Sequence, residues 1–230
     1  MTRSWESQGF GRLLVAGRAA MLFGGLAALL ASCALFRGEQ REAWRADAEL
    51  ACFSARLVQE SPYVRRAPEI DGAGACGLSR PFAVSALAYA SVGLAPAATL
   101  SCSMVPSLES WIAAVVQPAA HAFYGVPVAQ LTVASSYSCR TIAGSSNTSE
   151  HAFANALDVS AFTLVDGRRI TVLRGWRGDA IDQAFLRAVH DGACAQFSTV
   201  LGPDANADHR DHFHLDLARH NASGTYKVCE

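Results

Sequence analysis

Two short segments of the 230-residue chain combine histidine and carboxylate side chains at spacings that suit a metal site. His151 is followed seven residues later by Asp158, and His214 lies near the carboxyl end. Catalytic zinc takes three protein ligands from His, Asp, Glu or Cys and keeps a fourth position for water, whose pKa it lowers to about 7. His151, Asp158 and His214 therefore predict a Zn²⁺ site.

Strand-like alternation shows how these side chains can face one way. Residues 212–217 read His-Phe-His-Leu-Asp-Leu, and the period of two puts His212, His214 and Asp216 on one face. The apolar face can pack on a core. We expect His212 to lie beside His214, and Asp216 to be structural.

Asp158 lies in a second alternating segment, residues 156–162. It shares one face with Ser160, whereas Leu157, Val159 and Ala161 face the other way. A carboxylate in such apolar surroundings needs a partner, because a buried unpaired charge is very costly. The chain between His151 and Asp158 can fold the histidine back over this strand.

A known motif covers the first segment. Residues 149–158, Ser-Glu-His-Ala-Phe-Ala-Asn-Ala-Leu-Asp, resemble the S-x-H-x-x-G-x-A-x-D motif of D-Ala-D-Ala metallopeptidases, with Ala154 where glycine is usual. Asp211, three residues before His214, resembles their second motif. Arg140 falls where those enzymes carry an arginine upstream of the first motif.

The resemblance implies a role for each matching residue. His151, Asp158 and His214 become the zinc ligands, and Asp211 takes the general-base position. Arg140 would bind a substrate carbonyl or carboxylate, and its fixed charge would stabilise a developing oxyanion. Ser149 would support the first motif.

A second candidate for the base comes from a different resemblance. The spacing of His209, His212 and His214 is similar to that of penicillin-insensitive murein endopeptidases, in which a histidine rather than an acid serves near the metal. We therefore place Asp211 first and His212 second for this role.

The longest resemblance is to the extensin-like C-terminal domain family of bacteria. It covers residues 69–229 and is carried by five stretches, residues 97–102, 117–120, 136–140, 149–152 and 200–204. The related superfamily includes lysostaphin, the D-Ala-D-Ala metallopeptidases and sonic hedgehog. It implies zinc and, for its enzymes, the cleavage of peptidoglycan peptide bonds.

Periodicity and breaker residues predict an α+β fold, a small, mostly antiparallel sheet with flanking helices, zinc-peptidase-like and stapled by disulfides. Asp166-Gly167 predicts a type I′ hairpin turn. Expected helices cover residues 37–60, a segment from Ser107 that ends or kinks at Pro118, and residues 179–190 before Gly192. Expected strands cover residues 128–137, 156–165, 169–173, 197–201 and 212–218.

The amino-terminal segment predicts export. Arg12 and Arg18 precede an uncharged apolar run over residues 19–36, as in a secretory signal. Leu-Ala-Ser-Cys at residues 30–33 resembles a bacterial lipobox, which would make Cys33 the lipidated first residue. The alternative is an uncleaved membrane anchor. We divide the chain into this segment (1–33), a helical linker (34–68) and the extensin-like domain (69–230).

Cysteine usage agrees with an exported chain. Setting Cys33 aside leaves an even number of cysteines, which predicts disulfides in an oxidising compartment. The sequence does not choose among their pairings. The six candidates are Cys52, Cys76, Cys102, Cys139, Cys194 and Cys229.

Composition excludes other classes of function. The net charge is −1, and no basic run with interleaved aromatic residues marks a nucleic-acid binder. We expect a zinc-dependent peptidase or amidase in the bacterial cell envelope, periplasmic and membrane-anchored, acting on peptidoglycan stem peptides or crosslinks. The alternative is a non-catalytic envelope module that holds zinc for structure or for binding wall peptides.

Overall fold

The structure is a computed structural model, and it describes residues 41–230. These residues form one unit by their internal contacts. Cys33 and the apolar segment around it lie outside the described residues. No helix between Arg41 and Glu230 combines the length and apolar character that crossing a bilayer requires.

The helices differ from the expected ones mainly at their ends. They are α2 (Ala43–Ser54), α3 (Met104–Trp111), the π-helical η1 (Ile112–Val116), α4 (Gln117–Tyr124), the 3₁₀ turn η2 (Glu150–Phe153), α5 (Val172–Gly175), α6 (Ala180–Ala193) and the 3₁₀ turn η3 (Ala207–His209). The helix expected over residues 37–60 is shorter, because α2 stops at Ser54. Asp179 caps α6 as expected, accepting from the backbone N–H groups of Ile181 and Asp182.

Three predicted helix ends were wrong. The helix expected to start at Ser107 begins at Met104, with Pro106 in its first turn, where a missing N–H leaves no hydrogen bond unmade. Pro118 does not end it, because the π-helical turn η1 precedes α4 and Pro118 lies in the first turn of α4. Gly192 does not stop α6, which continues to Ala193.

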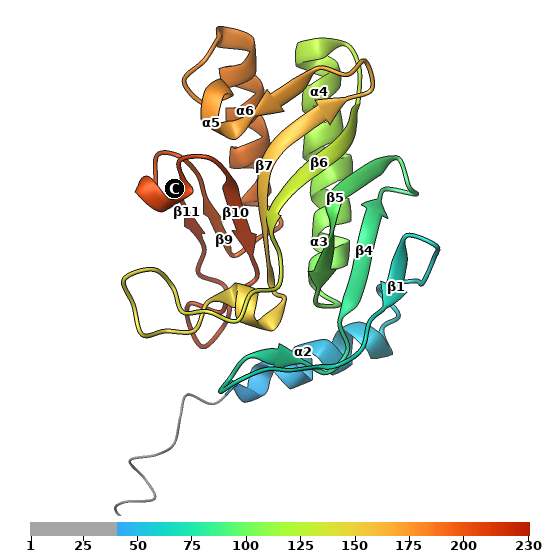
Figure 1. Ribbon diagram of the computed structural model, residues 1–230, viewed down its shortest axis with the longest axis vertical. Helices are drawn as coiled ribbons and strands as arrows, with labels where there is room; N and C mark the ends of the chain where they lie inside the picture. Colours follow the sequence, from blue (N-terminus) through green and yellow to red (C-terminus); the bar gives the residue numbers. More distant parts are fainter. Residues whose placement is uncertain (1–40) are drawn as a thin grey trace, which may run out of the picture. The chain divides into compact units, whose positions relative to one another are not determined.

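A nine-stranded mixed sheet forms the centre of the fold (Figure 1). Its path is β1-β4-β5-β6-β7-β10-β9-β11, with β8 paired to β7. These strands are β1 (Val64–Arg66), β4 (Phe82–Leu87), β5 (Val92–Leu100), β6 (Val128–Ser135), β7 (Ala156–Leu164), β8 (Arg169–Thr171), β9 (Thr199–Leu201), β10 (Phe213–Asp216) and β11 (Val228–Cys229). A separate two-stranded ladder joins β2 (Ile70–Asp71) and β3 (Gly77–Leu78).

This architecture confirms the α+β class. The sheet is antiparallel at most of its pairings, but β5 runs parallel to β6 and β11 runs parallel to β9. The β7–β8 hairpin is confirmed, whereas its type I′ turn was wrong. Among the turn residues, Gly167 has a positive φ of 86° and Asp166 does not, so the turn is not the mirror-image type.

Helices α3, α4 and α6 enclose an aromatic core against the sheet (Figure 1). Trp111 lies edge-on to Phe162 and Phe197, and its indole N–H donates to the carbonyl of Val189 at 2.9 Å. Phe162 in turn contacts Phe185 of α6. This core holds β7 and β10 in place and leaves their other face for polar side chains.

Two β-bulges in the β6–β7 pairing follow Asp158 along β7. Asp158 pairs with Ser135, and the β6–β7 register shifts between this pair and the Val133–Val159 pair, and again between Val133–Val159 and Thr132–Ala161. The second shift inserts Ser160, so the alternation expected up to Ala161 breaks after Val159. Bulges of this kind re-aim side chains, and here they begin directly after the strand position that carries the carboxylate.

Candidate metal centre

His151 belongs to the short turn η2 and is fully buried. Ser149 precedes this turn as its N-cap, and its hydroxyl accepts from the backbone N–H of His151 at 3.4 Å. The Nδ1 atom of His151 lies in hydrogen-bond contact with the carbonyl of Ser136. When Nδ1–H donates to that carbonyl, the Nε2 lone pair of the neutral ring is available to a metal held between His151 and Asp158.

Asp158 and His214 face each other across the β7–β10 ladder. They are direct partners in the register, so their side chains lie on the same face of the sheet. Phe213 and Leu215 point to the opposite face and are fully buried in the core. The alternation predicted for residues 213–216 is therefore confirmed.

Asp216 holds the far side of the His214 ring. Its Oδ2 lies 2.9 Å from His214 Nε2, and its Oδ1 accepts from the backbone N–H of Ala218. This contact directs the Nδ1 atom of His214 toward Asp158. A carboxylate behind a histidine is the arrangement that orients metal-binding imidazoles and raises their basicity.

The three predicted ligands converge on one point. Asp158 Oδ1 lies 3.1 Å from His151 Nε2 and 3.0 Å from His214 Nδ1, and the two nitrogens are 3.2 Å apart. Ligand atoms around a tetrahedral zinc ion with bonds of about 2.0–2.1 Å would be about 3.3–3.4 Å apart. Small movements of the three side chains would therefore admit an ion.

Within residues 41–230, these three form the group of His, Cys, Asp or Glu side chains whose ligand atoms lie close enough to hold a metal. The donor set, two imidazole nitrogens and a carboxylate oxygen, fits a divalent transition metal. The structure therefore supports a metal site, and the choice of zinc remains a proposal.

Electrostatics also link the three side chains. Burial raises the pKa of Asp158, but hydrogen bonds from His151 and His214 outweigh it and hold this pKa well below its usual range. Burial lowers the pKa of His214, but its hydrogen bonds to Asp158 and Asp216 outweigh it and raise the pKa to about 9. A proton on His214 thus occupies the place that a metal would take.

Of the two candidates for the base, His212 lies nearer to the predicted ligands. Its Nε2 is 3.8 Å from Asp158 Oδ2, and its side chain is largely buried. Asp211 is half exposed and contacts the other ring nitrogen, Nδ1 of His212, at 2.8 Å. The structure therefore places Asp211 behind His212, and within the described part of the chain no hydrogen bond or ion pair joins Asp211 to the three ligands.

His209 completes a cluster of histidines beside the site. Its ring centre is 5.3 Å from that of His212 and 5.8 Å from that of His214. Burial, together with the charges of His214 and His212, lowers the pKa of His209 to about 4. His209 is therefore neutral near pH 7, with Nδ1 2.8 Å from the side-chain oxygen of Asn206.

Arg140 is not brought to the ligands. It is exposed, and its guanidinium donates to the carbonyl of Thr141 at 3.4 Å. Its own carbonyl accepts from the backbone N–H of Ser149, so the chain around Arg140 runs beside the start of the first motif. Its predicted role requires movement of this long side chain toward the site.

The backbone conformation at Ala154 explains why the metallopeptidase motif usually has glycine at this position. Ala154 closes η2 in the left-handed conformation, with φ 51° and ψ 26°. That conformation favours glycine, which accounts for glycine being usual at this position. Alanine is the smallest residue with a Cβ, and the turn keeps its shape here.

Two contacts around the site escaped prediction. The carbonyl of Ser136 carries no side-chain signal, so nothing in the sequence marks it as a partner of His151. Asp216 was expected to be structural, and its contact with His214 is visible only as the H-x-D spacing on one strand face.

Comparison with known proteins decides the family. The family model described as "Extensin-like protein C-terminus" matches residues 50–230, most of the chain. The chain belongs to this family. Searches of curated proteins and of solved structures gave no match. The matched range includes η2, β7 and β10, so the whole candidate metal centre lies in the part of the chain that the family model matches.

Proposed function

We propose that this extensin-like protein is a zinc-dependent hydrolase of peptidoglycan peptides, a peptidase or an amidase. One observation carries the proposal: two imidazole nitrogens and one carboxylate oxygen converge, and each imidazole is held from behind by an oxygen acceptor. When bound, the ion supplies Lewis-acid chemistry, which allows water to attack an amide near neutral pH.

The chain supplies the remaining roles through groups beside the ligands. His212 is the better placed proton acceptor, because its Nε2 faces the site while Asp211 fixes its other nitrogen. This reverses the order expected from the sequence. Asp211 then acts as a positioning residue that sets the tautomer of His212.

Envelope localisation belongs to the same proposal. Three disulfides within residues 41–230 support folding in an oxidising compartment. A periplasmic protein attached to the membrane through its amino terminus would meet peptidoglycan stem peptides and crosslinks.

Digestion of purified sacculi tests the proposal. We expect the zinc-loaded protein to release shortened or uncrosslinked peptides, identified by mass, and a chelator to stop the release. His214→Ala should abolish cleavage. His220→Ala is the matched control, since its exposed ring contacts Thr199 rather than the metal centre.

Sacculi left unchanged by metal-loaded protein would contradict the hydrolase. If that protein also held zinc and co-sedimented with sacculi, the non-catalytic binding module would replace it. The three-residue ligand set favours the enzyme, because catalytic zinc sites keep a position free of protein ligands whereas structural sites use four.

A further inference from the structure

The first turns of α2 contact the segment that carries His151. Arg45 donates from Nη1 to Glu150 Oε2 at 2.7 Å and from Nη2 to Glu150 Oε1 at 2.6 Å. The pair is bidentate, and both side chains are nearly buried, with 9% and 12% exposed. Such paired, desolvated contacts fix geometry as well as adding attraction.

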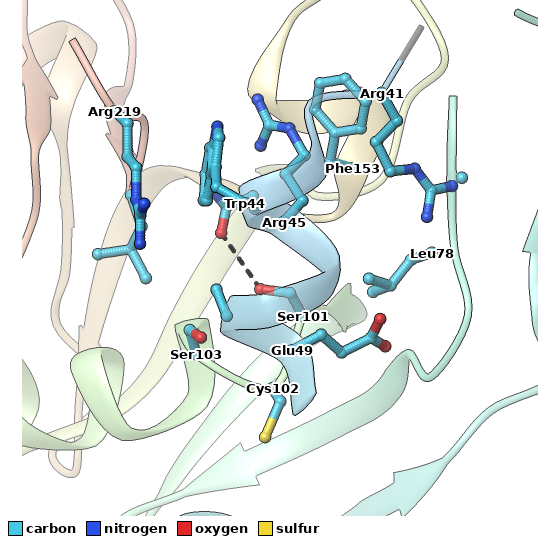
Figure 2. Close-up of a pocket in the computed structure, with 14 residues that line it drawn as sticks. Arg41, Trp44, Arg45, Glu49, Leu78, Ser101, Cys102, Ser103, Phe153 and Arg219 are labelled. Atoms are coloured by element: carbon cyan, nitrogen blue, oxygen red, sulfur yellow. Dashed lines mark hydrogen bonds between the residues drawn. The ribbon is translucent and has the colours of Figure 1, made fainter. Parts of the chain in front are cut away.

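Stacking and a second carboxylate hold Arg45 in this position. The guanidinium lies 3.8 Å from the ring centre of Phe153 and 4.4 Å from that of Trp44. Its Nε donates to Glu42 Oε2 at 2.6 Å. Figure 2 shows Arg45 and Trp44 projecting from α2, with Phe153 close to the Arg45 guanidinium.

Glu150 connects Arg45 to both ends of η2, the turn that contains His151. Glu150 directly precedes His151, and its Oε2 also accepts from the side-chain amide of Asn155 at 2.6 Å. The backbone N–H of Asn155 donates to the Glu150 carbonyl. Asn155 is the last residue before β7, the strand that carries Asp158. Contacts among Arg45, Glu150 and Asn155 therefore fix the segment that joins His151 to Asp158.

The turn needs such outside support. η2 has four residues, and a 3₁₀ turn of that length has poor hydrogen-bond geometry of its own. Beside it, a cavity of about 190 Å³ separates α2 from the body of the fold. Its lining includes Arg45, Glu49 and Arg219. The Cys52–Cys102 disulfide and the Phe53–Phe82 stack fasten the carboxyl half of α2, so the Arg45 contacts are what join its first turns to η2.

The residues that make this contact lie on both sides of the family boundary. Glu150 and Phe153 fall within the matched range, whereas Trp44 and Arg45 precede residue 50, where the match begins. Helix α2 runs across this position, so the support comes from the first turns of a helix whose last residues lie in the matched range.

We propose that Arg45 is a positioning residue for the metal centre: through its bidentate pair with Glu150, α2 holds the turn that presents His151. This inference rests on the proposed metal site. It does not require that the site cleave peptides.

Metal affinity of the full chain tests the inference. We expect Arg45→Ala to weaken zinc binding about 10-fold, because mutations of groups that support metal ligands typically cost 10–100-fold in affinity and Arg45 acts through Glu150. Competition with a chromophoric chelator measures the affinity. Arg45→Lys keeps the positive charge but loses the planar pair of donors that binds both oxygens of Glu150, so we expect an intermediate zinc affinity. Arg177→Ala is the control, because Arg177 pairs with Asp204 on the surface and not with α2, and its side chain is 75% exposed.

Cobalt substitution separates positioning from general stability. Arg45→Ala should change the visible absorption of the bound Co²⁺, because His151 shifts, while thermal unfolding confirms that the variant is folded. In a Glu150→Gln background, Arg45→Ala should have little further effect, since the pair is already broken.

The outcomes distinguish the two proposals. Wild-type affinity and an unchanged cobalt spectrum in folded Arg45→Ala would overturn the positioning role alone. A wild-type protein that holds no metal would overturn the metal centre and the positioning role with it. Altered affinity in a protein that leaves sacculi intact would retain the role of Arg45 and remove the hydrolase.

Discussion

At the scale of single residues, the metal centre depends on acceptors that direct the two imidazoles. Ser136 offers a backbone carbonyl to His151, and Asp216 offers a carboxylate to His214. The ligands themselves were predictable from the sequence, because their types and spacing match a known motif. The two acceptors were less predictable from the sequence. A backbone carbonyl has no sequence signal, and the position of Asp216 fits an ordinary strand residue equally well.

Removing the carboxylate behind His214 should weaken metal binding. We expect Asp216→Asn to lower zinc affinity by about 10–100-fold, because the ring loses its orientation and part of its basicity. Titration with a competing chelator measures this. Asp191→Asn is the control, since Asp191 contacts His190 away from the centre and its side chain is 79% exposed. Equal affinity in the two variants would contradict the role of Asp216.

The raised pKa of His214 sets the pH dependence of metal binding. Below a pKa of about 9 His214 carries a proton that the metal must displace, so zinc affinity should rise with pH up to about 9. Calorimetric titration in buffers of different ionisation enthalpy should show proton release at pH 7. Binding without proton release would contradict the protonated state of His214.

The same shift has the opposite sign for the stability of the metal-free protein. The folded pKa lies above the ordinary value of 6.5, so the contribution of charged His214 is present below pH 6.5 and is lost as pH rises through about 9. The urea midpoint of chelated protein should fall over that window. A matching fall in His214→Ala would assign the effect to other groups.

At the scale of elements, the sequence predicted β6, β7, β8 and β10 and the body of α6 well, because their apolar periods are regular. It predicted the helix around residues 104–124 less well. Prolines there occupy first-turn positions, and a π-helical turn lies between α3 and α4, so breaker residues were misleading. The β7 bulge at Ser160 was also missed, since a bulge depends on the partner strand.

The disulfide between Cys52 and Cys102 fastens α2 to the segment before α3. Replacing both cysteines by serine should lower the free energy of unfolding by roughly 2–5 kcal/mol, because the unfolded chain gains freedom that the bond removes. Urea unfolding measures the change. Since α2 also supports His151 through Arg45, the variant should bind zinc more weakly as well. An unchanged unfolding midpoint would show that α2 is held by other contacts.

At the scale of the whole molecule, we expect the fold not to depend on a metal. An aromatic core and three disulfides hold the domain, and the centre lies on the polar face of β7 and β10. The α+β class and the family could be inferred from the sequence. The parallel pairing of β9 with β11 could not, because it joins distant segments and β11 has only two residues.

Chelation should therefore leave the domain folded. We expect an unchanged far-ultraviolet circular dichroism spectrum after metal removal, and a melting temperature that rises with added zinc according to its dissociation constant. Unfolding upon chelation would instead indicate a structural metal of the zinc-finger type.

The position of a bound ion tests the central claim most directly. Crystals grown with zinc and measured at the zinc absorption edge should show an anomalous peak about 2.0–2.2 Å from His151 Nε2, the Asp158 carboxylate and His214 Nδ1. A peak that involves other residues instead, or no peak between these three side chains, would contradict the account.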